Sequence, residues 1–405
     1  MQPTPSVTPG SQRNVLRGAV FIMATSSIGP AFLTQTSLFT EKYLASFAFA
    51  IVISLLIDIG AQLNIWRVIT VANLRGQDVA NRVILGVGHL ISAFIVLGGI
   101  AFNIGNIGGA GLAMNVLFDI PPVIGSLIAG VAIIGIFLLR NAKGVMDSVM
   151  QLLGLVMLCM IGYAMLQSNP PVLEALSRSF NPDDPLILLL PIVTLVGGTV
   201  GGYISFSGGH RLVEAGITGV QNVGLVTRAA ITGIATTGIV RICLFLAALG
   251  VVSQGLTLDP GNPAASVFSH SIGTVGYKMF GVVLLAASVS SVIGAAYTSV
   301  TFMYSLHESI QRNNRWMVIA FIGCSTLIYS LVGQPVKVLV VAGTLNALVL
   351  PLALGCVLWA AKKPSIVGDE YRHPTWMMVF GLLAMLATAV GVVMSFNAFV
   401  DFWQS

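Results

Sequence analysis

The stretch Thr25-Ser26-Ser27-Ile28-Gly29-Pro30-Ala31-Phe32 lies in the middle of the first long apolar segment of the chain. Pro30 has no backbone N–H to donate and Gly29 is conformationally free, so a helix that begins near Val15 is predicted to break at these two residues. Inside a bilayer, the backbone groups released by a break are tolerated only where they face protein or a water-filled cavity. The stretch therefore predicts a polar site within an apolar helix.

The composition of the chain places this break in a membrane. Of the 405 residues, 56% are hydrophobic and only 8% are charged, whereas soluble domains carry roughly 25% charged residues. The chain is therefore predicted to be an all-α polytopic membrane protein with about eleven transmembrane helices, preceded by a polar, disordered cytoplasmic tail at 1–13. The predicted spans are 15–40, 44–66, 83–112, 121–140, 146–167, 186–209, 224–252, 275–305, 316–333, 336–361 and 375–399.

A second helix break is predicted about five apolar spans after the first. It runs from Gly197-Gly198 through Gly201-Gly202-Tyr203. Broken helices at corresponding positions of two halves are typical of the binding site of a secondary transporter. The pairing predicts a single transmembrane domain at 14–399, built from an inverted repeat of five plus five helices. We expect the repeats at about 14–167 and 186–361, followed by an extra helix at about 375–399.

The distribution of basic residues predicts the orientation of the chain. With the N-terminus inside, the outer segments hold only Lys42, Arg178, Lys278 and Lys337. Under the positive-inside rule, this bias places the N-terminus in the cytoplasm and, after about eleven spans, the C-terminus outside. We therefore expect a multi-pass protein of the cytoplasmic (inner) membrane. The cytoplasmic basic residues are Arg13, Arg17, Arg67, Arg75, Arg82, Arg140, Lys143, Arg211, Arg228, Arg312, Arg315, Lys362, Lys363 and Arg372.

Three strings give the chain a resemblance to a known family. Leu284–Gly294 reads LLAASVSSVIG, similar to the family's LLAAGQSSTxTG, and Leu112–Pro121 reads LAMNVLFDIP, similar to IALNLLFGIP. The third string, Gly198-Thr199-Val200, lies at the second break. On these strings the chain resembles the natural resistance-associated macrophage protein (NRAMP) metal transporters over most of its length. The resemblance implies the LeuT-type fold of the APC superfamily, with helices 1 and 6 discontinuous.

The metal-binding residues of that family do not carry over by position. Gly29-Pro30-Ala31-Phe32 aligns with the family's Asp-Pro-Gly-Asn, and Gly201-Gly202-Tyr203-Ile204 aligns with its Met-Pro-His-Asn. The family's Asp and Glu of the proton pathway fall on Asn103 and Asn106. Because divalent transition ions need carboxylate, imidazole or sulfur ligands, we expect no metal site of that kind. Backbone carbonyls and hydroxyls leave only a weak site for a hard ion such as Mg²⁺.

Arg241 is a charged residue in the middle of the seventh span. A charged side chain at membrane depth is costly and usually faces a cavity or a partner. Two interpretations stay open. In the first, Arg241 forms a structural pair with an acid such as Asp58 or reaches toward an interface. In the second, its guanidinium binds a substrate carboxylate through two hydrogen bonds.

Polar groups near the two breaks complete the predicted substrate site. Half-helix N-termini offer N–H groups and a partial positive charge, while Ser and Thr hydroxyls either contact substrate or bond within their own helices. Asn103 and Asn106 either bond between helices or line the pathway. The predicted substrate-binding residues are Thr25, Ser26, Ser27, Gly29, Pro30, Ala31, Phe32, Gln35, Gly201, Gly202, Tyr203 and Arg241, with Ser205 and Ser207 as further hydroxyl candidates.

Together these features predict a secondary active transporter that works by alternating access. The expected cargo is a small organic solute with a carboxylate, such as an amino acid, 5-oxoproline or another organic acid, in symport with H⁺ or Na⁺. The alternative is a divalent cation transporter (Mn²⁺ or Mg²⁺ type) with an altered site. An enzyme is not expected because the chain has no HExxH, no GxSxG and no clustered His/Asp set, and paired broken helices fit a channel poorly. No cofactor and no nucleic-acid partner is expected.

Overall fold

The computed structural model describes residues 16, 18–20, 24, 27–138 and 142–404. This part of the chain is helical and contains no β-strand. The longer helices are α2 (Pro30–Tyr43), α3 (Phe47–Ala72), α5 (Val87–Phe118), α6 (Pro122–Leu138), α7 (Ala142–Gln167), α9 (Leu189–Thr199), α10 (Ile204–Glu214), α11 (Val223–Ser253), α12 (Pro263–Phe302), α14 (Asn314–Val332), α15 (Pro335–Ala360) and α17 (Thr375–Met394). The shorter ones are η1 (Leu44–Ser46), α4 (Gly76–Val83), α8 (Val172–Arg178), η2 (Val220–Asn222), η3 (Met303–Ser305), α13 (Glu308–Arg312), α16 (Pro364–Val367) and α18 (Phe396–Gln404).

The long apolar helices are able to cross a membrane. Among the described residues, eight segments are long and apolar enough to do so, and a bent pair, Gly154–Gln167 with Val172–Arg178, makes a ninth. This count takes α2 and α3 together as one segment, Pro30–Ala72, and leaves out the shorter apolar helix at Pro122–Ile136. A helix nevertheless overlaps each span predicted from the sequence. The two counts differ in how bent and short helices are divided.

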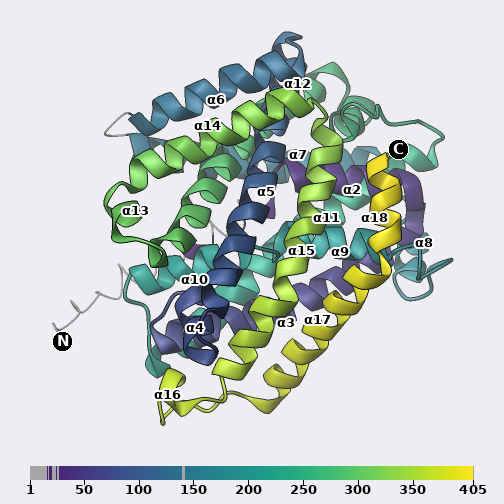
Figure 1. Cartoon of the computed structure of the whole chain (residues 1–405). Helices are drawn as coiled ribbons and strands as arrows, with labels where there is room; N and C mark the ends of the chain where they lie inside the picture. The colour runs from purple at the N-terminus through teal and green to yellow at the C-terminus, as the bar shows by residue number, and fades with distance from the viewer. Residues whose placement is uncertain (1–15, 17, 21–23, 25–26, 139–141, 405) are drawn as a thin grey trace.

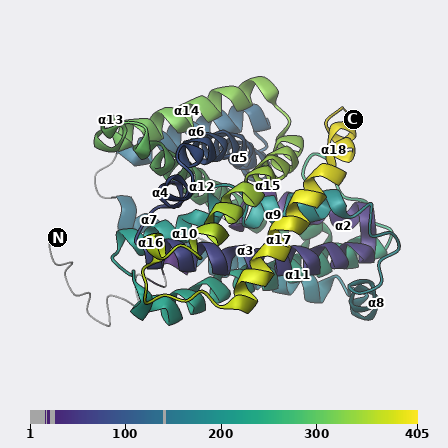
Figure 2. The same ribbon diagram turned by 60° about the horizontal axis from the view of Figure 1, so that its bottom comes forward.

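The helices pack in pairs that follow the order of the two predicted repeats. α3 packs against α11, α5 against α12, and α6 against α14, so each pair joins equivalent helices of the two halves. Figure 1 shows α6 and α14 together along one side of the bundle, with α4 and α16 at one end and α18 at the other. In Figure 2, α17 crosses the outside of the bundle, where it packs on α3.

The first break lies where the sequence predicts it. Ile28 and Gly29 form a bend, and α2 begins at Pro30, which is the first residue of the helix. Proline suits this position because its missing N–H would have no partner inside the helix, and its φ is already helical. A Cβ on Gly29 would lie only 2.6 Å from the Ser291 hydroxyl oxygen of α12. The bend therefore holds the chain close to a neighbouring helix.

The second break is shorter than the sequence suggests. Gly197 and Gly198 are helical residues of α9, so the prediction that the break begins there is wrong. The interruption runs from Val200 to Tyr203, and Gly202 has a φ of 53°. This left-handed conformation favours glycine, and a Cβ at Gly202 would lie 1.9 Å from Asn346 Oδ1 of α15. Gly197 is instead required for packing, since its Cβ would meet the Gly343 carbonyl.

Two regions expected to be loops contain helices. α8 lies inside the loop expected at 168–185, and α12 begins at Pro263 rather than at residue 275. Gly273 interrupts α12 with a φ of 77°, so the N-terminal part of α12 is set at a kink to the membrane-spanning part. The Asn262 side chain caps this part by accepting a hydrogen bond from the Ala265 N–H. A short capped helix of this kind carries no long apolar run, which is why hydropathy did not reveal it.

Candidate functional site

Hydrogen bonds join the two helix breaks in the centre of the bundle. The Ser27 hydroxyl, beside the first break, donates to the Thr199 carbonyl at the end of α9, at 3.2 Å. The Thr199 hydroxyl in turn donates to Asp58 Oδ2 of α3, at 2.6 Å. Ser27 and the second break therefore meet at one point, with a buried carboxylate beside them. Two predicted site residues, Thr25 and Ser26, lie outside the described part of the chain.

Arg241 of α11 lies beside the first break. Its side chain is fully buried, and its guanidinium stacks over the Phe32 ring of α2 with 4.7 Å between the guanidinium carbon and the ring centroid. None of its three nitrogens has a hydrogen-bond partner among the described residues. Asp58 interacts with it electrostatically, but the two groups do not form a direct ion pair. The structural pair considered from the sequence is therefore only a longer-range attraction.

A second group of buried polar atoms lies near the first break. Asn106 of α5 places its Oδ1 3.6 Å from the Cβ position of Gly29. The Tyr203 hydroxyl lies near the Asn106 amide, and its ring packs edge-on against Phe102, with centroids 5.7 Å apart. Neither Tyr203 nor Asn106 makes a well-formed side-chain hydrogen bond to another described residue. These two side chains provide neutral hydrogen-bonding groups at the junction of the breaks.

Other predicted residues support the site rather than line it. Gln35 donates from Nε2 to the Leu339 carbonyl of α15 at 2.8 Å, which ties α2 to α15. Asn103 donates to the Ser325 hydroxyl of α14 at 3.2 Å, so the interhelical alternative holds for this residue. Pro30 packs against Gly109, where a Cβ would lie 2.3 Å from the proline ring. These contacts position α2 and α5.

The structure adds residues that the sequence did not include in the site. Asp58 was considered only as a structural partner of Arg241, and Thr199 only as part of a family string. Both lie at the junction of the breaks, together with Asn346 of α15, which donates to the Gly98 carbonyl and approaches Gly202. The sequence itself could have indicated Asp58, because a single acidic residue within an apolar span is a candidate functional residue. Ser205 and Ser207 instead bond to backbone carbonyls of their own segment, Val200 and Ile204.

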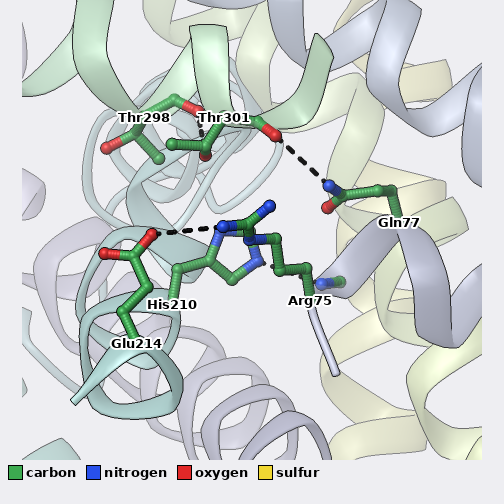
Figure 3. Close-up of polar contacts among 7 residues, drawn as sticks. Arg75, Gln77, His210, Glu214, Thr298 and Thr301 are labelled. Atoms are coloured by element: carbon green, nitrogen blue, oxygen red, sulfur yellow. Dashed lines mark hydrogen bonds and ion pairs between the residues drawn. The ribbon is translucent and has the colours of Figure 1, made fainter. Parts of the chain in front are cut away.

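A separate polar cluster lies at the end of the bundle that carries α4 (Figure 3). Arg75 pairs with Glu214 of α10 at 3.6 Å, and both side chains are about a quarter exposed, at 24% and 25%. His210 Nε2 accepts a hydrogen bond from the Gly76 N–H at the start of α4, at 3.0 Å. Since Nε2 is the acceptor, a neutral His210 carries its proton on Nδ1. These contacts join α4 to α10, the second half of the broken helix.

The same cluster also reaches α12 and η3. Gln77 donates to the Thr301 carbonyl at 3.3 Å, as Figure 3 shows, and the Arg75 guanidinium lies 4.9 Å from the Tyr304 ring centroid. Next to it on α4, burial raises the pKa of the Asp78 carboxyl above its usual value, and the Arg75 charge opposes that rise. The cluster therefore joins α4, α10, α12 and η3 at one end of the bundle.

The donor set of the central site differs from that of a transition-metal centre. Asp58 is the one carboxylate at the junction of the breaks in the part of the chain described, and the residues aligned with the family's metal ligands are Gly29, Phe32, Gly201 and Tyr203. No group of three or more His, Cys, Asp or Glu residues among the described positions is arranged to hold a metal ion. A buried guanidinium next to this junction repels cations and attracts anions.

Two broken helices joined at mid-bundle define the class of this protein: it is a multi-pass membrane transporter. A family model described as natural resistance-associated macrophage protein-like (Nramp) matches residues 20–397, and the chain belongs to that family. It is 52% identical over 377 residues to the uncharacterized membrane protein YcsG of Bacillus subtilis (strain 168), covering 93% of each chain. It is 50% identical over 382 residues to an uncharacterized membrane protein of Haemophilus influenzae, covering 94% of this chain and 95% of the other.

Solved structures show that the fold is LeuT-type. A mutant form of a manganese transporter from Eremococcus coleocola superposes with a TM-score of 0.73 at 16% identity, covering all of this chain and 90% of that one. MhsT in complex with L-phenylalanine gives 0.64 at 16% identity, covering 94% and 98%. Inward-facing Mhp1 gives 0.59 at 16% identity, covering 95% and 90%. The fold and family are those of transporters, as the sequence predicted. At this identity the structural likeness concerns the fold alone.

Proposed function

We propose that this chain transports a small organic anion by alternating access, and that Arg241 binds the carboxylate of the cargo. The observation that supports this most directly is a fully buried guanidinium whose nitrogens have no hydrogen-bond partner among the described residues. A buried charge without partners is strongly unfavourable. A carboxylate bound through two parallel hydrogen bonds removes that penalty with suitable geometry.

The position of Arg241 supports the same proposal. The Arg241 guanidinium lies over the Phe32 ring in the first turn of α2, which places it beside the N-terminus of that helix. The first N–H groups of that helix and its partial positive charge add attraction for an anion. Neutral polar groups, Asn106 and Tyr203, lie near the bend. The expected cargo is therefore a compact acid with a further polar group, such as an amino acid or 5-oxoproline.

A divalent metal is the second candidate because the chain belongs to the Nramp family and shares its fold with a manganese transporter. The donor set argues against it. Glycine, phenylalanine and tyrosine replace the expected ligands, and Asp58 already accepts a hydrogen bond from Thr199. One carboxylate beside an arginine does not offset the dehydration of Mn²⁺ or Fe²⁺.

A thermal-shift screen of the purified protein in detergent tests the two candidates together. Acetate, propionate, L-lactate, L-alanine and 5-oxoproline form one arm, and Mn²⁺ and Mg²⁺ form the other. A carboxylate at 100 times its Kd stabilises the folded state by about 2.7 kcal/mol, so a clear rise in Tm is expected. Stabilisation by Mn²⁺ and by none of the carboxylates would reverse the assignment.

A variant pair then connects the binding to the site. Arg241→Gln is expected to abolish the carboxylate-dependent shift and proteoliposome uptake. Arg228→Gln is the matched control because Arg228 lies on the same helix, α11, and is exposed. It is expected to keep both. If Arg241→Gln folds and transports normally, the guanidinium does not bind cargo.

A further inference from the structure

The Asp58 carboxylate is buried, and only one of its two oxygens has a hydrogen-bond partner among the described residues. It is 2% exposed and lies within the membrane-spanning part of α3. Its Oδ2 accepts the Thr199 hydroxyl at 2.6 Å, while its Oδ1 has no hydrogen-bond partner among the described residues. Arg241 attracts it without a direct ion pair. A purely structural pair in this setting normally makes direct contact, because only close geometry offsets the desolvation of two charges.

The surroundings of Asp58 leave Arg241 as its one charged neighbour in the described structure. The elements packed against α3 include α9 and α17, which carry no titratable side chain. Of the groups on the other packed elements, only Arg241 acts on Asp58 electrostatically. The remaining groups on these elements are Glu41, Lys42 and Tyr43 of α2, Asp78 and Arg82 of α4, Glu174 and Arg178 of α8, His210, Arg211 and Glu214 of α10, Arg228 and Cys243 of α11, and Lys337 and Cys356 of α15.

Binding of an anionic cargo changes the net charge of the site formed by Arg241 and Asp58. Without cargo, one cation and one carboxylate lie near each other and their charges cancel. If an anion binds to Arg241, the site holds two negative groups and one positive group in a medium of low dielectric constant. Like charges in such a site favour protonation of one carboxylate. Asp58 has a free oxygen, Oδ1, that is available to take the proton.

We propose that Asp58 is the proton-binding site of this transporter and that one proton binds to Asp58 Oδ1 when an organic anion binds to Arg241. This inference rests on the proposed function and names H⁺ as the coupling ion. In the balanced step, the anion and one proton enter the site together, the O–H bond forms on Asp58, and both leave together on the other side. After release, Asp58 is again the counterion of Arg241.

The hydrogen bonds of Asp58 connect its protonation to the two broken helices. Thr199, whose hydroxyl Asp58 accepts, is the last residue of α9 before the second break. Its carbonyl accepts the hydroxyl of Ser27 beside the first break. Protonation weakens the attraction of the carboxylate for the Thr199 hydroxyl, because charge-assisted hydrogen bonds are the stronger ones. The charge of Asp58 therefore bears on the contact between the two broken helices.

Isothermal titration calorimetry of the purified protein tests the proton directly. The tightest-binding member of the carboxylate panel is titrated between pH 5.5 and 8.5, in buffers of different ionisation enthalpy. We expect uptake of about one proton per anion, and a Kd that rises about tenfold per pH unit across the coupling range. Asp58→Asn should bind without proton uptake and with a flat pH profile, and should lose uphill uptake driven by a pH gradient.

Matched variants make the outcome decisive. Asp119→Asn is the control, because Asp119 is exposed and its left-handed conformation at the end of α5 is one that asparagine tolerates. It should behave like the wild type. If Asp58→Asn does not fold, Thr199→Val replaces it. Loss of the donated hydroxyl should move the pH midpoint of binding upward, and an unchanged midpoint would overturn the proposal.

The two proposals fail in different ways. If the wild type binds a carboxylate without proton uptake, or Asp58→Asn still takes up a proton, Asp58 is not the coupling site and the organic-anion function stands. If no carboxylate of the panel binds to the wild type and Mn²⁺ does, the proposed function and this inference are both overturned.

Discussion

Two arginines of this chain stack on aromatic rings, and they differ in almost everything else. Arg75 lies over Tyr304, is about a quarter exposed and pairs with Glu214 at 3.6 Å. Arg241 lies over Phe32, is fully buried and has no direct partner among the residues described. The first arrangement costs little and is easily broken, since exposed ion pairs contribute roughly 0–1 kcal/mol. The second arrangement is energetically costly unless another group forms hydrogen bonds with the buried guanidinium.

The contrast indicates that the two arginines have different roles. A weak, solvated pair between α4 and α10 suits an end that opens and closes. A buried, incomplete guanidinium at the helix breaks suits a binding site, because occupancy itself removes the penalty. The predictions below test this contrast, from the largest expected effect to the smallest.

The largest effect is expected on binding. Arg241→Lys keeps the positive charge but loses the planar pair of donors, so the affinity for the tightest carboxylate of the panel should fall at least about tenfold, and Arg241→Gln should lower it about 100-fold. Arg75→Gln should change it no more than about threefold. Equilibrium binding measures all three. Equal losses in Arg75→Gln and Arg241→Gln would remove the distinction between the two arginines.

The next effect concerns stability. The double variant Asp58→Asn with Arg241→Met removes both buried charges at similar side-chain volume. We expect its free energy of unfolding to rise by roughly 1–4 kcal/mol, as for other buried pairs replaced together, while Arg241→Met alone should be the less stable of the two. Denaturation in detergent measures this. A double variant less stable than the wild type would show that the pair stabilises the fold.

The aromatic ring under each arginine gives a smaller effect. Phe32→Leu removes the surface that orients the Arg241 guanidinium, and cation–π contacts contribute about 0.5–2 kcal/mol. Carboxylate affinity should therefore fall about threefold to tenfold in equilibrium binding. Tyr304→Leu makes the same change under Arg75 and should leave the affinity unaltered. A loss in the Tyr304 variant alone would contradict this assignment.

A third basic residue, His373, is partly buried. His373, before α17, donates from Nε2 to Asn64 Oδ1 and accepts the Tyr371 hydroxyl at Nδ1, each at 2.8 Å. Asn64 Nδ2 donates to two carbonyls, which fixes its Oδ1 as the acceptor. Burial, aided by the Arg67 charge, lowers the pKa of His373 to about 4, against about 6.5 in the unfolded chain.

That shift makes stability depend on pH in acid. Between about pH 6.5 and pH 4 the unfolded state binds the proton more readily, so His373 should cost the folded state stability as the pH falls. Solvent screening reduces the expected loss to about 1 kcal/mol. His373→Gln should weaken this dependence in thermal unfolding scans between pH 7 and pH 4. A wild type equally stable throughout that range would refute the prediction.

The smallest effect is expected for the exposed pair itself. Glu214→Gln should change the free energy of unfolding by less than about 1 kcal/mol, and high salt should remove the difference from wild type because it screens the pair. Unfolding at low and high NaCl measures this. A loss above about 2 kcal/mol would mean that the cluster in Figure 3 behaves as a buried network.

The features predicted correctly from the sequence are those decided by local chemistry. The first helix breaks at Gly29 and Pro30 because proline cannot continue a helix, and the second break includes Gly201, Gly202 and Tyr203, as predicted. These statements depend on one or two residues at a time. The apolar spans follow equally from local composition, so the fold class and family resemblance were accessible.

The remaining features depend on contacts between distant residues. Thr199 and Asp58 are 141 residues apart, and Ser27 and Thr199 are 172 apart. No local pattern indicates that these three share hydrogen bonds. The limits of the second break were misplaced for the same reason. Gly197 stays helical because α15 packs on it closely, which only the tertiary structure reveals.

The Thr199 hydroxyl has a single proton, and it is shared between Asp58 and the Leu195 carbonyl. The Ser27 hydroxyl likewise gives its proton to the Thr199 carbonyl. The Thr199 oxygen therefore has a lone pair but no further proton to offer, whereas Arg241 presents only N–H groups. We expect the site to prefer acids that carry an N–H or O–H group close to the carboxylate. L-lactate should therefore bind more tightly than propionate, and equal affinities would show that the Thr199 oxygen does not contact the cargo.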